Sequence, residues 1–132
     1  MIKDKALTYF NNGYSCSESI VKAAIDEGLC PKDLLPCATT FSAGMSSGCA
    51  CGTITGAQLV LGYLFGRENK FGNQASAREK AAELVERFRK ENKVTCCRIL
   101  SAGYEGSAKK AHCAKFVENS CDILEDLIKV KV

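Results

Sequence analysis

Proline is scarce in this chain of 132 residues, and its two prolines, Pro31 and Pro36, lie close together. Elsewhere no proline ring removes a backbone N–H or clashes with the preceding helical turn, so long helices are allowed almost everywhere. No segment alternates apolar and polar residues convincingly with a period of two, the pattern of a half-buried strand. The two absences together favour an all-α fold.

Several motifs that would identify an enzyme or a metal site are also missing. There is no C-x-x-C pair, which excludes zinc knuckles, and no C-x-x-C-H, which excludes a covalently attached c-type haem. No phosphate-binding G-x-x-x-x-G-K-[ST] loop occurs. The single histidine, His112, has no evident partners for a Ser-His-Asp triad, and we expect it at the surface or at a helix end rather than as a ligand.

A strong excess of either charge is missing as well. The 18 Lys and Arg exceed the 15 Asp and Glu by a net +3, and the basic residues form no single run, so nucleic acid is not an expected partner. The longest weakly polar stretch, Gly52–Gly66, is too short for a bilayer span, which predicts a buried helix and no membrane insertion. The first residues lack the apolar region of a secretory signal, so we expect a cytoplasmic protein.

Apolar residues recur at intervals of three and four in several segments, which is the spacing of one helix face. The expected helices are a short one around Ala6–Phe10 that stops at Asn11-Asn12-Gly13, then Ser17–Glu27, Ser76–Asn92, and Ser107 to about Val130 with Ser107 as N-cap.

The segment Gly44–Gly56 is rich in glycine and small polar residues and predicts a loop that leads into the apolar helix Gly56–Phe65. If Gly52 and Gly56 are helical, they would let another backbone approach closely. With 46% hydrophobic and 25% charged residues, the expected architecture is a single compact helical domain over residues 1–132. It has a glycine-rich loop before a buried central helix and a long C-terminal amphipathic helix.

Cysteine is abundant instead, with nine residues: Cys16, Cys30, Cys37, Cys49, Cys51, Cys96, Cys97, Cys113 and Cys121. An odd number cannot pair completely within one chain, and a reducing compartment keeps thiols free, so a disulfide framework is not expected. Free cysteine also packs as a small hydrophobic residue, and this is the reading that we favour for Cys30, Cys37 and Cys121.

Three of the thiols fall near predicted helix starts: Cys16, Cys51 and Cys97. A helix start offers unpaired N–H groups and partial positive charge, which stabilise a thiolate or an anionic cluster bound by thiolates. Cys113 lies instead on the apolar face of the last helix, with Phe116 and Val117, from which it could meet the other three in the core.

These residues resemble the motifs of the small cysteine-rich C_GCAxxG_C_C family, described as redox-active proteins, which combines a first cysteine, a central motif that we read as CGAxxG, and two later cysteines. The corresponding elements are Tyr14-Ser15-Cys16-Ser17-Glu18, the glycine-rich lead Phe41–Met45 with Cys51-Gly52-Thr53-Ile54-Thr55-Gly56, Cys97-Arg98-Ile99-Leu100, and Cys113 as the best match to the fourth cysteine. The elements run from about Ala6 to Leu127. The domain is also similar to the N-terminal part of the split-Soret cytochromes c.

The sequence departs from the motif in having Thr53 where the motif has alanine. Cys49, Cys96 and Cys121 are additional cysteines that stand as alternatives to one of the four. The resemblance implies an all-helical domain that gathers four cysteines, with an iron–sulfur cluster as proposed for the split-Soret relatives. Their haem-carrying portion has no counterpart here.

Three functions follow as hypotheses. The first is an iron–sulfur electron carrier or redox sensor, whose cluster is held by Cys16, Cys51, Cys97 and Cys113. Aerobic preparation could remove this cofactor. The second is a thiol–disulfide protein in which Cys51 attacks and Cys49, Cys97 or Cys16 resolves. The third is a structural or zinc-binding interaction module, since the apolar glycine-rich helix could support a homodimer.

The sequence names neither a redox partner protein nor a substrate, and it identifies no catalytic residue. The redox hypothesis requires the sulfur atoms of positions 16, 51, 97 and 113, which are distant along the chain, to lie together around one small pocket.

Overall fold

The computed structural model describes residues 2–129. Within this range the chain forms helices and no strand, apart from one isolated antiparallel bridge between Ala50 and Cys96, so the predicted all-α class is confirmed. The elements in chain order are α1 (Ile2–Asn11), α2 (Cys16–Asp26), the 3₁₀ turn η1 (Lys32–Leu34), α3 (Leu35–Thr39), the irregular turn η2 (Gly44–Gly48), α4 (Gly52–Phe65), α5 (Ala75–Asn92), α6 (Cys97–Leu100) and α7 (Gly106–Lys129).

The start of α2 is fixed by a capping box. The Ser15 hydroxyl accepts a hydrogen bond from the Glu18 N–H at 3.3 Å, and the Glu18 carboxylate accepts one from the Ser15 N–H at 3.0 Å. The pair satisfies two N–H groups that the first turn of a helix leaves without partners. Cys16 therefore occupies the first helical position of α2, at a point that the local sequence determines.

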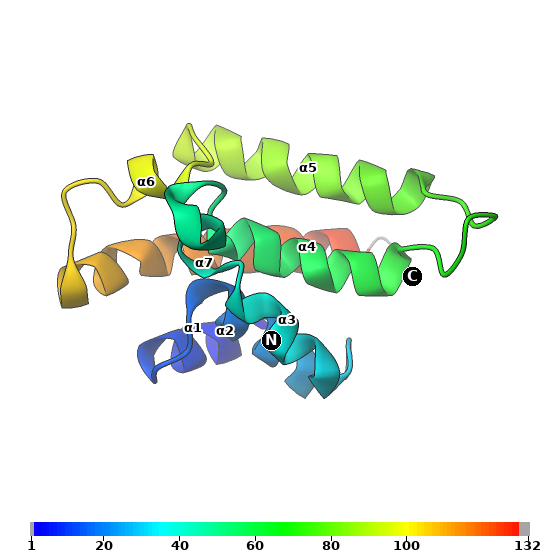
Figure 1. The fold of residues 1–132 in the computed structure, drawn as a ribbon, viewed down its shortest axis with the longest axis horizontal. Coiled ribbons are helices and arrows are strands. Elements are labelled where there is room, and N and C mark those ends of the chain that lie inside the picture. The colour runs from blue at the N-terminus through cyan, green and yellow to red at the C-terminus, as the bar shows by residue number, and fades with distance from the viewer. Residues whose placement is uncertain (1, 130–132) are drawn as a thin grey trace.

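The apolar helix α4 lies at the centre of the fold, in contact with α2, α5 and α7 (Figure 1). Its residue Gly56 lies against α2, since a Cβ at this position would be 2.8 Å from the Ser17 carbonyl oxygen and 2.9 Å from the Ser17 Cα. The predicted close approach of another backbone at Gly56 is therefore confirmed. No helix within residues 2–129, α4 included, is long and apolar enough to cross a membrane.

The two long helices, α5 and α7, pack against α4 and against each other (Figure 1). The α5 helix buries Leu84 and Phe88, and the ring of Phe88 packs on that of Phe116 from α7 with 5.9 Å between centroids. On the outer side, Arg87 pairs with Asp126 of α7 at 2.8 Å and more loosely with Glu83 at 3.6 Å. The apolar spacing read from both segments thus describes their buried faces.

The predicted helices are present, with small differences at their ends. Ser107 is not an N-cap: α7 begins at Gly106, because the Glu105 carbonyl already accepts a hydrogen bond from the Lys109 N–H. The central helix begins at Gly52 rather than Gly56, so the glycine-rich loop is shorter than expected. The predicted end of the last helix at Val130 lies outside the described residues.

Candidate functional site

Cys16, Cys51, Cys97 and Cys113 line one cavity of about 240 Å³. The cavity lies where the starts of α2, α4 and α6 meet α7 and the loop before α4. Its walls are completed by Phe10, Ser15, Ser42, Ala43, Thr53, Gly106, Lys109 and Lys110. The structure thus brings together the four cysteines that the sequence singled out, as the redox hypothesis requires.

Cys16 and Cys51 are brought together by a glycine. Cys51 is the N-cap of α4, and a Cβ on the next residue, Gly52, would collide with the Cys16 sulfur. The missing side chain at position 52 leaves room for the Cys16 sulfur against the start of α4. The packing role predicted for Gly52 is therefore a role in the site itself.

Cys97 is positioned by a short antiparallel pairing. The Cys97 N–H donates to the Cys49 carbonyl at 2.5 Å, and the Cys51 N–H donates to the Thr95 carbonyl at 2.8 Å, on either side of the bridge between Ala50 and Cys96. This pairing joins two segments that are distant in sequence, and it places Cys97 beside Cys51 at the cavity.

Cys113 enters from the third turn of α7, next to His112. The His112 Nε2 lies 2.9 Å from the Leu100 carbonyl oxygen at the end of α6, so Nε2–H is the donor. The same ring stacks on Tyr104 with centroids 3.8 Å apart and contacts the edge of Phe116. His112 is therefore half-buried in the second turn of α7, partly at the surface as expected. The His112 hydrogen bond connects α7 to the end of α6, and it thereby helps to place Cys97 near Cys113.

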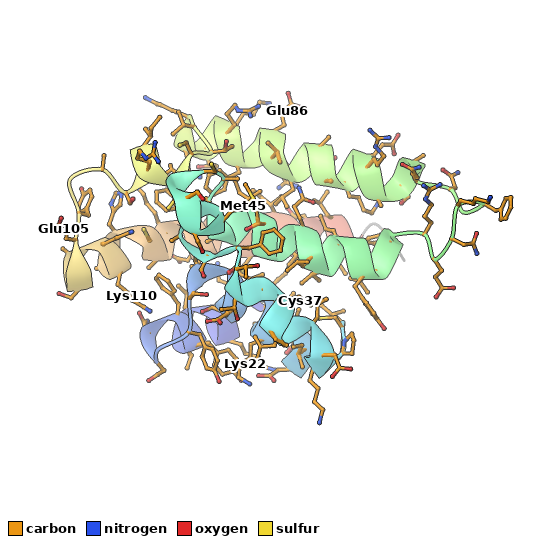
Figure 2. The ribbon with its side chains drawn as sticks, in the orientation of Figure 1. Lys22, Cys37, Met45, Glu86, Glu105 and Lys110 are labelled. Atoms are coloured by element: carbon orange, nitrogen blue, oxygen red, sulfur yellow. The ribbon has the colours of Figure 1, made fainter. Side chains whose placement is uncertain are left out.

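The loop before α4 has an unusual backbone. Ala43, Met45 and Ser46 have φ between 53° and 60°, the left-handed region that side chains rarely adopt, and Gly44 and Gly48 share it. Gly44 is required here, because a Cβ at this position would be 2.7 Å from the Cβ of Cys97. The loop is exposed, and Met45 marks it in Figure 2. Arg98 of α6 contacts it, since its Nη2 donates a hydrogen bond to the Ser47 carbonyl at 3.0 Å. Such strain is most often retained at functional sites.

Burial, rather than the helix starts, controls the acidity of three of the cavity thiols. It raises the pKa of Cys51 to about 12, and it also raises the pKa of Cys16 and of Cys113. Backbone N–H groups of Ala43 and Ser17 oppose the rise at Cys16. The expectation that helix starts favour a thiolate at Cys16 and Cys51 is therefore wrong for the unligated thiols, because desolvation of the charge outweighs the N–H donors.

The other five cysteines, all free, lie outside the cavity lining. Cys30 and Cys121 are buried in the core, as predicted. Cys37 is exposed on α3 (Figure 2), so its predicted role as core packing is wrong. Of the additional cysteines near the site, Cys49 is exposed, and the Cys96 Sγ donates to the Gly48 carbonyl at 3.1 Å.

Sequence reasoning did not assign a role to several residues of the cavity wall. Lys109 and Lys110 lie one turn before Cys113 on α7. The Lys110 ammonium group, whose residue is labelled in Figure 2, donates to the Tyr14 carbonyl at 3.2 Å and lies over the Phe10 ring. The sequence does carry a signal for them: the two lysines precede Cys113 by four and three residues, a spacing that places them on the same helix face as Cys113.

A family model described as "Putative redox-active protein (C_GCAxxG_C_C)" matches residues 14–127. The chain belongs to this family. The match covers all four cysteines that line the cavity and most of the fold around them. No curated protein and no solved structure matches the chain. The C_GCAxxG_C_C description identifies redox activity in general terms, and it names neither a cofactor nor a partner.

Proposed function

We propose that this protein is an electron carrier or redox sensor that holds an iron–sulfur cluster on Cys16, Cys51, Cys97 and Cys113. The observation that carries the proposal is the lining of one cavity by four thiols from four separate segments of the chain. Four cysteine thiolates are the usual ligand set of both [2Fe–2S] and [4Fe–4S] clusters. The membership of a family described as redox-active supports the same class of chemistry.

The donor set fits a cluster better than a single ion. Within residues 2–129, no group of three or more His, Cys, Asp or Glu side chains is arranged to hold one metal ion. A zinc ion draws its sulfur ligands to about 2.3 Å from one point. The four thiolates of a cluster are shared among several iron atoms, one per iron in [4Fe–4S] and two per iron in [2Fe–2S]. Four cysteines that line one cavity supply the number and type of ligands that such a cluster takes.

A bound cluster would supply one-electron exchange between redox partners. The residues of this chain would supply its surroundings. Burial of Cys51 excludes water from one side, and the Ala43 and Ser17 N–H groups act on the Cys16 sulfur. The Lys109 ammonium group favours the charged form of Cys113. Metal ligation deprotonates a thiol outright, so the raised pKa values of Cys16, Cys51 and Cys113 extend to higher pH the range over which metal binding strengthens.

The raised pKa of Cys51 also bears on the alternative of thiol–disulfide chemistry. An attacking cysteine must be a thiolate near neutral pH, and burial raises the Cys51 pKa to about 12. At pH 7 the thiolate would be about one molecule in 10⁵. A ligand role is therefore favoured over a nucleophilic one for this residue. The proposal includes a cytoplasmic location, because a reducing compartment keeps the nine thiols free.

The experiment is anaerobic purification followed by analysis of iron, acid-labile sulfide and visible absorbance. We expect iron and sulfide in the wild type and a large loss of both in Cys16→Ser, Cys51→Ser, Cys97→Ser and Cys113→Ser. The chain offers matched controls: Cys49→Ser beside Cys51, Cys96→Ser beside Cys97, and Cys121→Ala on the same helix as Cys113. Wild-type protein without iron and sulfide would overturn the proposal, and an equal loss in the control variants would overturn the ligand assignment.

A further inference from the structure

Two buried hydroxyl groups lie behind Cys51. Thr53, in the first turn of α4, has 1% of its surface exposed, and Ser120 of α7 has none. The Ser120 Oγ donates a hydrogen bond to the Thr53 Oγ1 at 2.9 Å, and the Thr53 Oγ1 lies 3.2 Å from the Cys51 sulfur. The three side chains form a chain of hydrogen bonds that connects the core of α7 to the cavity.

The direction of the first hydrogen bond leaves the Thr53 hydroxyl free to donate the second. A hydroxyl group has one proton to donate and two lone pairs to accept. Because Ser120 donates to Thr53, the Thr53 proton remains available for the Cys51 sulfur. When Cys51 is a protonated thiol, its S–H can donate to Thr53 instead. When it is a thiolate or a metal ligand, only Thr53 can be the donor.

The electrostatics agree with this direction. The hydroxyl and the backbone N–H of Thr53 both lower the Cys51 pKa, against the larger rise caused by burial. They therefore favour the charged form of the sulfur. The CGAxxG motif that this segment resembles has alanine at the corresponding position, and alanine has no hydroxyl group to donate.

We propose that Thr53, oriented by Ser120, is a positioning residue that donates a hydrogen bond to the Cys51 sulfur whenever that sulfur carries negative charge, and that it thereby raises the reduction potential of the bound cluster. Hydrogen bonds to ligand sulfur atoms withdraw electron density and favour the reduced state. The part concerning potential rests on the proposed function. The part concerning the charged sulfur applies to the metal-free protein as well.

The test compares Thr53→Val, which keeps the shape and removes the hydroxyl, with Thr53→Ser, which keeps the hydroxyl, and with Ser120→Ala. In the metal-free protein, the rate of Cys51 alkylation by iodoacetamide at a fixed alkaline pH is followed by peptide mass spectrometry. We expect Thr53→Val to react about tenfold more slowly than the wild type, because the thiolate is less populated. Thr53→Ser should stay near the wild-type rate, and Ser120→Ala should fall between the two.

In anaerobically reconstituted protein, dye-mediated redox titration gives the potential directly. We expect a lower potential in Thr53→Val than in the wild type, and recovery in Thr53→Ser. Equal alkylation rates in Thr53→Val and wild type, or equal potentials, would show that the hydroxyl only fills space. If the wild type binds no iron, the proposed function fails, and the alkylation rates still decide whether Thr53 acts on Cys51.

Discussion

Gly52 lies directly against Cys16, so that any side chain at position 52 would collide with the Cys16 sulfur. The starts of α2 and α4 meet at this contact, because position 52 carries no side chain. The glycine after Cys51 is therefore needed to place a different cysteine, and its substitution tests the geometry of the cavity.

Gly52→Ala should displace Cys16 and lower the free energy of unfolding by about 1–3 kcal/mol, the usual cost of overpacking. It should also reduce the iron content of anaerobically prepared protein. The control is Gly62→Ala in the same helix, where a Cβ would meet no atom within 4 Å. That substitution should stabilise the protein by up to about 1 kcal/mol. Urea unfolding of both variants measures the difference, and equal stability would contradict the proposed contact.

The metal-free protein should lose stability in alkaline solution. Burial raises the Cys51 pKa from 9.0 to about 12, so the folded state holds this proton after the unfolded state has released it. The stabilising contribution is present below about pH 9 and is lost as the pH rises toward 12, at about 1.4 kcal/mol per pH unit. Cys51→Ser should show a shallower decline in urea unfolding between about pH 8 and pH 10. Cys37→Ser leaves Cys51 in place and should follow the wild type; identical slopes in all three proteins would refute the argument.

Arg98 should hold the loop before α4 against α6. Its guanidinium group donates to the Ser47 carbonyl, and its side chain packs within 3.1 Å of the position that a Cβ on Gly48 would occupy. Arg98→Ala should speed amide hydrogen exchange in residues 43–48 by about three- to tenfold, the effect of one lost hydrogen bond. Arg89→Ala, at an exposed arginine of α5, is the control. Unchanged exchange in the loop would show that other contacts hold it.

Phe88 should be among the most sensitive positions of the core. Its side chain is fully buried between α5 and α7, and Phe88→Ala should cost about 3–5 kcal/mol in urea unfolding. Phe71 is 87% exposed in the segment between α4 and α5, and Phe71→Ala should change stability by no more than about 0.5 kcal/mol. A similar effect of the two substitutions would mean that the packing of α5 on α7 contributes little.

The long helices were predictable because their apolar residues repeat over many turns, as Leu84 and Phe88 do on α5. The helices α3 and α6 have five and four residues, too few for a periodic pattern to be read. The left-handed backbone of Ala43, Met45 and Ser46 also has no sequence signal, because these residue types do not prefer that conformation. It is imposed by the tertiary contacts of the loop.

The four cysteines of the cavity could be selected from helix starts and from the family motif, whereas their acidity could not. Proximity to a helix start is a local property, and it was read correctly for Cys16 and Cys51. Desolvation depends on which elements cover the thiol, and it reversed the expected direction of the pKa. Exposure of Cys37 was missed for the same reason.

Cys37 and Cys49 reach solvent on α3 and in the loop before α4. Accessible thiols on separate molecules oxidise in air to intermolecular disulfides, which generate covalent dimers and larger species during storage. A molecular mass measured on such material would reflect oxidation during storage and not the native quaternary state. The quaternary state of this protein is therefore best determined on a Cys37→Ser, Cys49→Ser double variant kept under reductant, in which both cross-linking positions are removed and the cavity is left intact.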